Sequence, residues 1–264
     1  MVTPTIAVLG AWALFGGTHL LLSWPPIRQR LTNRLGDTPF ITLYAGVATA
    51  SLVLLAVVIA HEGGHGPRGL NLAAVPAAKW GLGAVAFAGT ALAMAGLAGY
   101  PKSAMAVLAR RMRASHDAAN QPLPGPTPIE RVTRHPFFIG LALVMTAHAL
   151  LAKTLAMMIF FGGFAFLTLV GISMQDRKLR QRHGSVYDDF ENATSVVPFA
   201  RTKSQSSPSS ARPVPVVATA ILGAALVGAL HPLWQLGHGA WFAVAVALGG
   251  LFATARQVWR TRAR

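Results

Sequence analysis

Long apolar runs separated by short polar stretches dominate the pattern of this chain. A membrane-crossing helix needs about 20 apolar residues, and five runs come close to or reach that length. Two shorter runs, at about 216–229 and 240–254, can also cross if they tilt or are extended by neighbouring residues. The pattern predicts an all-α, polytopic transmembrane helix bundle of six to seven spans. The five longer runs lie at about 5–24, 40–60, 79–100, 136–151 and 155–174.

The stretches between these runs divide the chain. Residues 101–115 place Met105, Leu108 and Met112 on one helical face with arginines opposite, which is typical of a helix lying in the membrane interface. A Ser- and Pro-rich stretch at 201–215 predicts a flexible linker. We therefore predict a membrane domain over 1–200, the linker over 201–215, and an appended transmembrane hairpin with a basic tail over 216–264.

Composition and charge place the chain in a membrane with a defined orientation. It has 264 residues, 53% hydrophobic and only 12% charged, against about 25% charged in soluble domains. With seven spans, all but three of the 23 Lys and Arg residues fall on one side; the exceptions are Arg68, Lys79 and Lys153. By the positive-inside rule the basic side is cytoplasmic, the N-terminus is outside and the C-terminus is cytoplasmic. Five spans with two peripheral helices would give the same orientation.

The same bias explains the net charge of +15 without nucleic acid as a partner, so the expected partner is the lipid bilayer. We expect a multi-pass protein of the bacterial inner membrane. The N-terminus lacks a basic stretch ahead of its apolar run, which favours a first span over a cleaved signal. There are no cysteines, so a metal or haem must be held by His, Met or oxygen ligands.

Two of the nine histidines, His19 and His148, lie inside apolar runs. A buried imidazole needs a partner for its nitrogens, and an intramembrane ionisable residue is a candidate for function. One interpretation is that each bonds a backbone carbonyl or a neighbouring threonine. The other is that the two, on separate spans, ligate a haem b. From the predicted boundaries, His148 lies about 10 Å deeper from the cytoplasmic face than His19, a mismatch that tilt and boundary errors could absorb.

The segment RHPFFIGLALVMTAHALL at 134–151 carries His148 and a further candidate pair. Pro136 suits the first turn of a helix, which puts Arg134 and His135 at its cytoplasmic start. His135 and His148 are about 20 Å apart along a helix and face about 220° apart, so one small site cannot hold both. Arg134 and His135 either bind haem propionates or another anion, or anchor the helix start among the lipid headgroups.

Four segments in order give a resemblance to a known family. They are GTHLLLS with His19, RLGDTPFITLYAGVA with Tyr44, the segment RHPFFIGLALVMTAHALL, and DRKLRQRHGSVYDDFENATSVVPFA at 176–200. Residues from about 5 to 200 resemble the NnrU family of bacterial membrane proteins, which is related to the 15-cis-zeta-carotene isomerase. Where the family usually has a tryptophan four residues before the second histidine, this chain has Val144.

The resemblance implies a cofactor and two classes of activity. The isomerase relatives bind haem b through two histidines, and the matching positions here are His19 and His148. NnrU proteins are associated with nitrite and nitric oxide reduction (denitrification), so the resemblance implies a nitrogen-oxide substrate or, as in the isomerase, a lipophilic one.

Two other classes remain open. Membrane methyltransferases that act on isoprenylcysteine or phospholipids bind S-adenosylmethionine and share the Arg-His-Pro motif and a G-x-x-Y-x-x-F segment, which fits Gly184, Tyr187 and Phe190. Their Glu-Glu pair is replaced here by Gln175-Asp176. The second alternative is a non-enzymatic membrane accessory protein without a cofactor.

Overall fold

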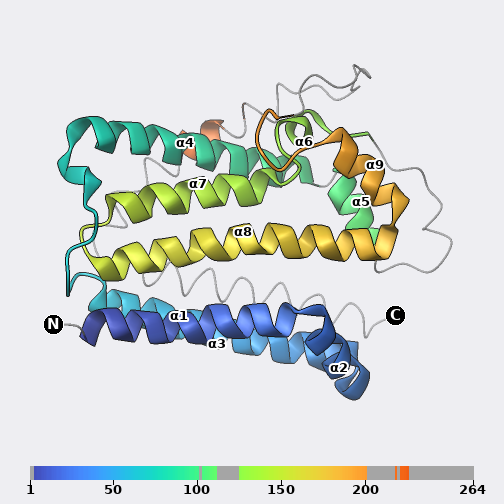
Figure 1. The fold of residues 1–264 in the computed structure, drawn as a ribbon, viewed down its shortest axis with the longest axis horizontal. Helices are drawn as coiled ribbons and strands as arrows, with labels where there is room; N and C mark the ends of the chain where they lie inside the picture. Colours follow the sequence, from blue (N-terminus) through green and yellow to red (C-terminus); the bar gives the residue numbers. More distant parts are fainter. Residues whose placement is uncertain (1–2, 101–102, 112–124, 201–217, 219–220, 226–264) are drawn as a thin grey trace. The chain divides into compact units, whose positions relative to one another are not determined.

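The computed structural model describes residues 3–100, 103–111, 125–200, 218 and 221–225, and these residues are helical apart from short connections (Figure 1). The predicted linker at 201–215 and nearly all of the predicted hairpin at 216–264 lie outside the described residues. The helices are α1 (Thr3–Ser23), α2 (Pro25–Leu35), α3 (Asp37–Glu62), the 3-10 turn η1 (Leu72–Ala74), α4 (Pro76–Gly99), α5 (Ala104–Arg111), α6 (Pro128–Val132), α7 (Pro136–Leu151), α8 (Leu155–His183) and α9 (Ser185–Ala193).

Four of these helices, α1, α3, α4 and α8, are long and apolar enough to cross a membrane, and α7 is a shorter apolar helix of 16 residues. The all-α prediction is therefore confirmed for the part of the chain that the structure describes. The predicted span at 136–151 coincides with α7. The predicted span at 155–174 lies within α8, which continues through its charged residues to His183.

The described residues form two compact units. Unit 1 contains residues 3–79 and 148–163, and unit 2 contains residues 80–147 and the described residues from 164 onward. Each long helix of the second half of the chain thus contributes one part to each unit.

In unit 1, α1 packs along α3 (Figure 1). Val8, Trp12 and Phe15 of α1 are buried at the helical spacing that presents one face to a neighbour. The indole of Trp12 also covers Gly163 of α8 so closely that a side chain there would overlap it. Pro25 and Pro26 end the first helix and begin α2, because proline suits the first turn of a helix but not its interior.

At one end of unit 1, two connections lie side by side. The Gly69 N–H donates to the Lys153 carbonyl at 2.9 Å, and the Leu155 N–H donates to the Pro67 carbonyl at 2.8 Å. The Thr154 hydroxyl donates to the Gly63 carbonyl at 2.5 Å. The loop after α3 and the turn between α7 and α8 therefore share one end, which is where the charge pattern puts the few external basic residues.

In unit 2, α4 and α7 approach each other at glycines (Figure 1). A Cβ atom on Gly89 would lie 2.7 Å from the Gly140 carbonyl oxygen, and one on Gly96 would lie 2.7 Å from the Phe137 nitrogen. Small residues at a helix crossing allow this close backbone contact, as is common between helices in membranes.

The prediction of a membrane-interface helix at 101–115 was wrong for the part that is described. The apolar face of α5 is buried within the protein, with Met105 and Leu108 packed in a core cluster. Residues that the chain supplies much later cover this face, and the sequence pattern alone does not distinguish lipid from protein as the cover. The partners in that cluster are Leu179, Tyr187 and Phe190.

Candidate functional site

The predicted ligand His19 lies half-buried on α1 between two aromatic rings. Phe15, one turn earlier on the same helix, has its ring centroid 5.8 Å away, and Tyr44 of α3 has its centroid at 5.5 Å. The spacing of four residues places Phe15 and His19 on one face of α1. Packing of α1 against α3 then brings Tyr44 to the same face.

A polar chain also joins these helices at His19. The Tyr44 hydroxyl lies 3.1 Å from Nδ1 and 3.2 Å from Nε2 of His19, and 3.1 Å from the Ser23 hydroxyl. The hydroxyl is almost equally far from both ring nitrogens, so the contact joins Tyr44 to the ring without assigning it to one nitrogen. Sequence reasoning had found Tyr44 only through the resemblance and had missed Ser23, although Ser23 follows His19 by one helical turn.

The second predicted ligand, His148, also belongs to unit 1. It lies half-buried three residues before the end of α7, with its ring centroid 5.1 Å from that of Phe161 on α8. An aromatic ring of α8 thus packs against this histidine.

The contacts of unit 1 show how far apart His19 and His148 lie along the helix axes. Gly66, beside the start of α8, approaches Pro4 of α1, and Gly163 lies against Trp12. The helices α1 and α8 therefore run in parallel. Gly163 of α8 lies beside Trp12 of α1, so Phe161 and the His148 ring that packs on it lie beside about residue 10 of α1. His19 is about nine residues further along α1, which is roughly 14 Å along the helix axis.

This offset decides how the residues fit a haem. Two imidazole nitrogens on one iron are roughly 4 Å apart, given a metal–nitrogen distance of about 2 Å. His19 has the chemistry of an iron ligand, because it is a half-buried imidazole on an apolar helix. An offset of roughly 14 Å does not fit His148 on the same iron. Among the described residues there is no group of three or more His, Asp or Glu residues that could hold a metal ion, and a haem does not require one.

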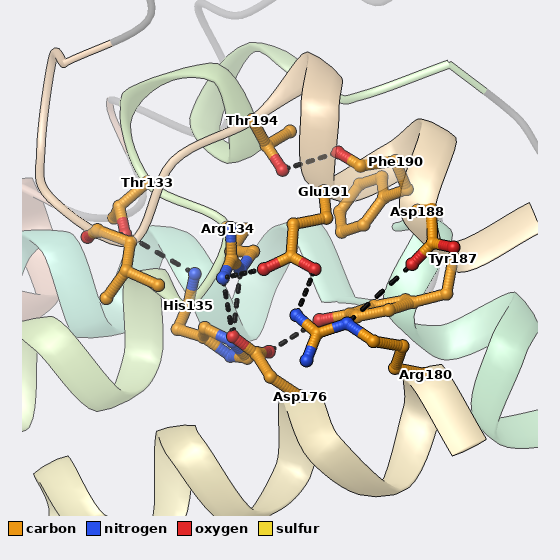
Figure 2. A network of polar contacts seen from close by, with 11 residues as sticks. Thr133, Arg134, His135, Asp176, Arg180, Tyr187, Asp188, Phe190, Glu191 and Thr194 are labelled. Atoms are coloured by element: carbon orange, nitrogen blue, oxygen red, sulfur yellow. Dashed lines mark hydrogen bonds and ion pairs between the residues drawn. The ribbon is translucent and has the colours of Figure 1, made fainter. Parts of the chain in front are cut away.

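The other two predicted residues, Arg134 and His135, lie in unit 2 in a buried polar network (Figure 2). They precede the first turn of α7, and their side chains are 9% and 2% exposed. Nε and Nη2 of Arg134 donate to Oδ2 of Asp176 at 3.1 and 2.6 Å. Nε2 of His135 lies 2.6 Å from Oδ1 of the same carboxylate, which also accepts the Tyr187 hydroxyl at 2.5 Å.

Asp176 is thus the centre of this network, with four hydrogen bonds to its two oxygens. The 29 residues of α8 span roughly 43 Å, more than the roughly 30 Å of a bilayer core, so its charged end lies beyond the membrane-spanning part. Burial would raise the pKa of Asp176, but hydrogen bonds from His135, Arg134 and Tyr187 outweigh it and lower the pKa to about 2. Burial and the neighbouring carboxylate raise the pKa of Tyr187.

These protonation states assign the hydrogen bonds. An ionised carboxylate can only accept, so Nε2 of His135 and the Tyr187 hydroxyl each donate their hydrogen to Asp176. All strong acceptor directions of Asp176 are then used within the protein. The network can orient and hold its members, but Asp176 has no remaining position for a substrate or cofactor.

A second carboxylate extends the network to α9 (Figure 2). Glu191 accepts from Nη2 of Arg134 at 2.8 Å and also pairs with Arg180 of α8. The segment after α9 returns to the same place, because the Arg134 N–H donates to the Ser195 carbonyl at 2.8 Å and the Thr133 hydroxyl donates to the Val196 carbonyl at 2.8 Å.

Sequence reasoning had noted Asp176 and Tyr187 only as members of motifs, and had not predicted that they meet Arg134 and His135. A signal was present, because Asp176 lies two residues after the apolar part of α8 and so had to lie near the start of α7. A protein with only eight Asp and Glu residues rarely places one there without a cation.

A family model described as NnrU protein matches residues 7–238. The chain belongs to the NnrU family. The match includes all four motif segments and the residues of both sites, and it continues past residue 200. No curated protein and no solved structure matches the chain.

Proposed function

We propose that this NnrU protein is a haem b-binding protein of the bacterial inner membrane, in which His19 is an axial ligand to the iron. The observation that carries the proposal is the environment of His19 on an apolar helix. Two aromatic rings flank its imidazole, and the Tyr44 hydroxyl lies within reach of both ring nitrogens. Neutral imidazole in such surroundings is a usual protein ligand of haem iron.

His148 does not bind the iron in this proposal. With an offset of roughly 14 Å from His19, His148 would not hold the same haem. A haem b held by His19 alone would supply electron transfer and binding of small molecules such as nitric oxide. We therefore place the activity in nitrogen-oxide metabolism, in line with the association of the NnrU family, rather than in carotenoid isomerisation.

Arg134 and His135 hold protein structure in this proposal and do not bind the cofactor. Both are already bonded to carboxylates, and an anion such as a haem propionate would have to displace Asp176 or Glu191 from Arg134. The same saturation of Asp176 argues against the methyltransferase alternative, since the carboxylate at that position is not available to a cationic cofactor.

The test is an absorption spectrum of detergent-purified protein, oxidised and then reduced with dithionite. We expect a Soret band in the wild type that is lost in His19→Ala and retained in His148→Ala. His65→Ala, at an exposed histidine of the loop after α3, is the matched control and should resemble the wild type.

Three results would contradict the proposal. A wild type that folds but stays colourless after haem supplementation would show that the protein does not bind haem. Binding of S-adenosylmethionine by that protein would favour the methyltransferase class. A Soret band retained in His19→Ala would show that His19 is not the ligand of the haem iron. Equal loss of the band in both variants would show that His19 and His148 share one iron after all.

A further inference from the structure

Helix α2 is the polar connection between α1 and α3, two apolar helices that are each long enough to cross a membrane. Because α1 and α3 pack side by side, the chain reverses its direction between them, and α2 lies at their shared end, turned out of the direction of both (Figure 1). Gly36 makes the turn from α2 into α3 with a φ of 87°, a conformation that favours glycine. A helix that joins two membrane spans in this way lies at the membrane surface.

The side chains of α2 are arranged as in a helix that rests in such a surface. Three apolar residues recur every four positions and so lie on one face: Ile27, Leu31 and Leu35. Arg28 borders this face on one side, and Arg30 and Arg34 border it on the other. Trp24, which directly precedes the helix, is 54% exposed, and tryptophan is enriched where membrane meets water. Basic side chains along the edges of an apolar face can reach lipid phosphates.

The three arginines of α2 differ in what they contact. The guanidinium of Arg28 lies 5.4 Å from the ring centroid of Phe40, so α3 holds it. Arg30 and Arg34 are exposed, and neither forms an ion pair with any residue that the structure describes. They are one helical turn apart, about 5–6 Å between Cβ atoms, and α2 contains no acidic residue. Two guanidinium groups at this spacing can share one phosphate.

We propose that α2 lies in the membrane surface and that Arg30 and Arg34 bind the phosphate of an anionic phospholipid. A lipid suits this surface better than a free anion, because Trp24 and Leu35 expose apolar area beside the arginines. The positive-inside bias puts this end of the helices in the cytoplasm, where the leaflet carries anionic lipids. The inference does not depend on the haem, since none of these residues belongs to the His19 site.

The experiment measures lipid binding to the full-length protein by native mass spectrometry, with phosphatidylglycerol as the anionic probe and phosphatidylcholine as the neutral one. The double variant Arg30→Gln/Arg34→Gln removes both exposed arginines and keeps residues that favour helix. The matched control is Arg177→Gln/Arg182→Gln. It removes two exposed arginines from α8 and therefore changes the net charge by the same amount.

We expect the wild type to prefer phosphatidylglycerol. Each basic residue at a membrane surface is worth about a five-fold preference for anionic lipid, so the double variant of α2 should lose about 25-fold of it. The control variant should keep the preference of the wild type within about two-fold.

Three results would overturn the inference. Wild-type preference in the α2 double variant would show that these arginines do not bind the lipid. An equal loss in the α8 control would show that net charge, and not the surface of α2, attracts the lipid. Release of phosphatidylglycerol by inorganic phosphate, but not by chloride at the same ionic strength, would show that the arginines take a free anion.

Discussion

At the scale of single residues, the buried carboxylate of Asp176 in unit 2 has hydrogen-bond partners for both of its oxygens. Asp176 accepts four hydrogen bonds from Arg134, His135 and Tyr187. Buried ion pairs are sensitive to loss of one partner, because the remaining charge is left without compensation. The RHP motif is therefore held in place by a residue 41 positions beyond its histidine.

The first prediction is that Asp176→Asn destabilises the folded protein by about 3–5 kcal/mol at neutral pH, because Arg134 loses its main counter-charge. The folded-state pKa of Asp176 is lowered to about 2 from an ordinary value of 3.8. Its contribution is therefore complete above pH 3.8 and is lost as the pH falls toward 2. The stability difference between wild type and variant should shrink over that interval.

Unfolding of both proteins in detergent as a function of pH would measure this difference. Asp188→Asn serves as a control, since Asp188 is half-exposed and its ion pair with the exposed Arg180 is long, at 3.7 Å. Loss of such an exposed pair should change the stability little at any pH. A difference between wild type and Asp176→Asn that stays constant down to pH 2 would show that the carboxylate charge is not what stabilises the network.

At the scale of elements, the sequence pattern predicted where helices begin and end better than it predicted what each helix packs against. The helix at 136–151 was predicted at its observed bounds because Pro136 begins it and Lys153 interrupts the apolar run. The face of α5 was misassigned, since Met105 and Leu108 would suit lipid as well as protein. The meeting of Tyr44 with His19 depends on how α1 packs against α3, which periodicity within one helix does not contain.

The second prediction concerns the crossing of α4 and α7 in unit 2. Gly96→Ala would place a Cβ atom 2.7 Å from the Phe137 nitrogen and 3.0 Å from Cγ of Pro136. Overpacking of this kind costs about 1–3 kcal/mol, so the variant should unfold at a lower temperature. Gly83→Ala, on the same helix with nothing within 4 Å, should be neutral or gain up to about 1 kcal/mol from helix propensity. Equal melting temperatures for the two variants would contradict the close crossing.

At the scale of the whole molecule, composition and the distribution of Lys and Arg predicted a helical membrane protein, and family membership and helix lengths agree with it. The histidine pair is where this reasoning was weakest. Counting residues gave an offset of about 10 Å between His19 and His148, whereas the contacts of unit 1 give roughly 14 Å. The difference arises because α1 and α8 run in parallel register, a relation between helices that no single span reveals.

The third prediction is the orientation. The natural chain has no cysteines, so single cysteines report access cleanly. Asn33→Cys on α2 and His65→Cys after α3 are both exposed positions. The positive-inside bias predicts that a membrane-impermeant maleimide labels His65→Cys in intact spheroplasts and labels Asn33→Cys only after the membrane is opened. The reverse pattern would invert the predicted topology.

The most direct test of the central claim, a haem held by His19 with one axial position open, is to add carbon monoxide to the dithionite-reduced protein and record the difference spectrum. The account predicts a carbon monoxide complex that forms at stoichiometric concentration and is equally strong in His148→Ala. A sharp low-spin spectrum that carbon monoxide does not change in the wild type, but does change in His148→Ala, would contradict it and make His148 the second ligand.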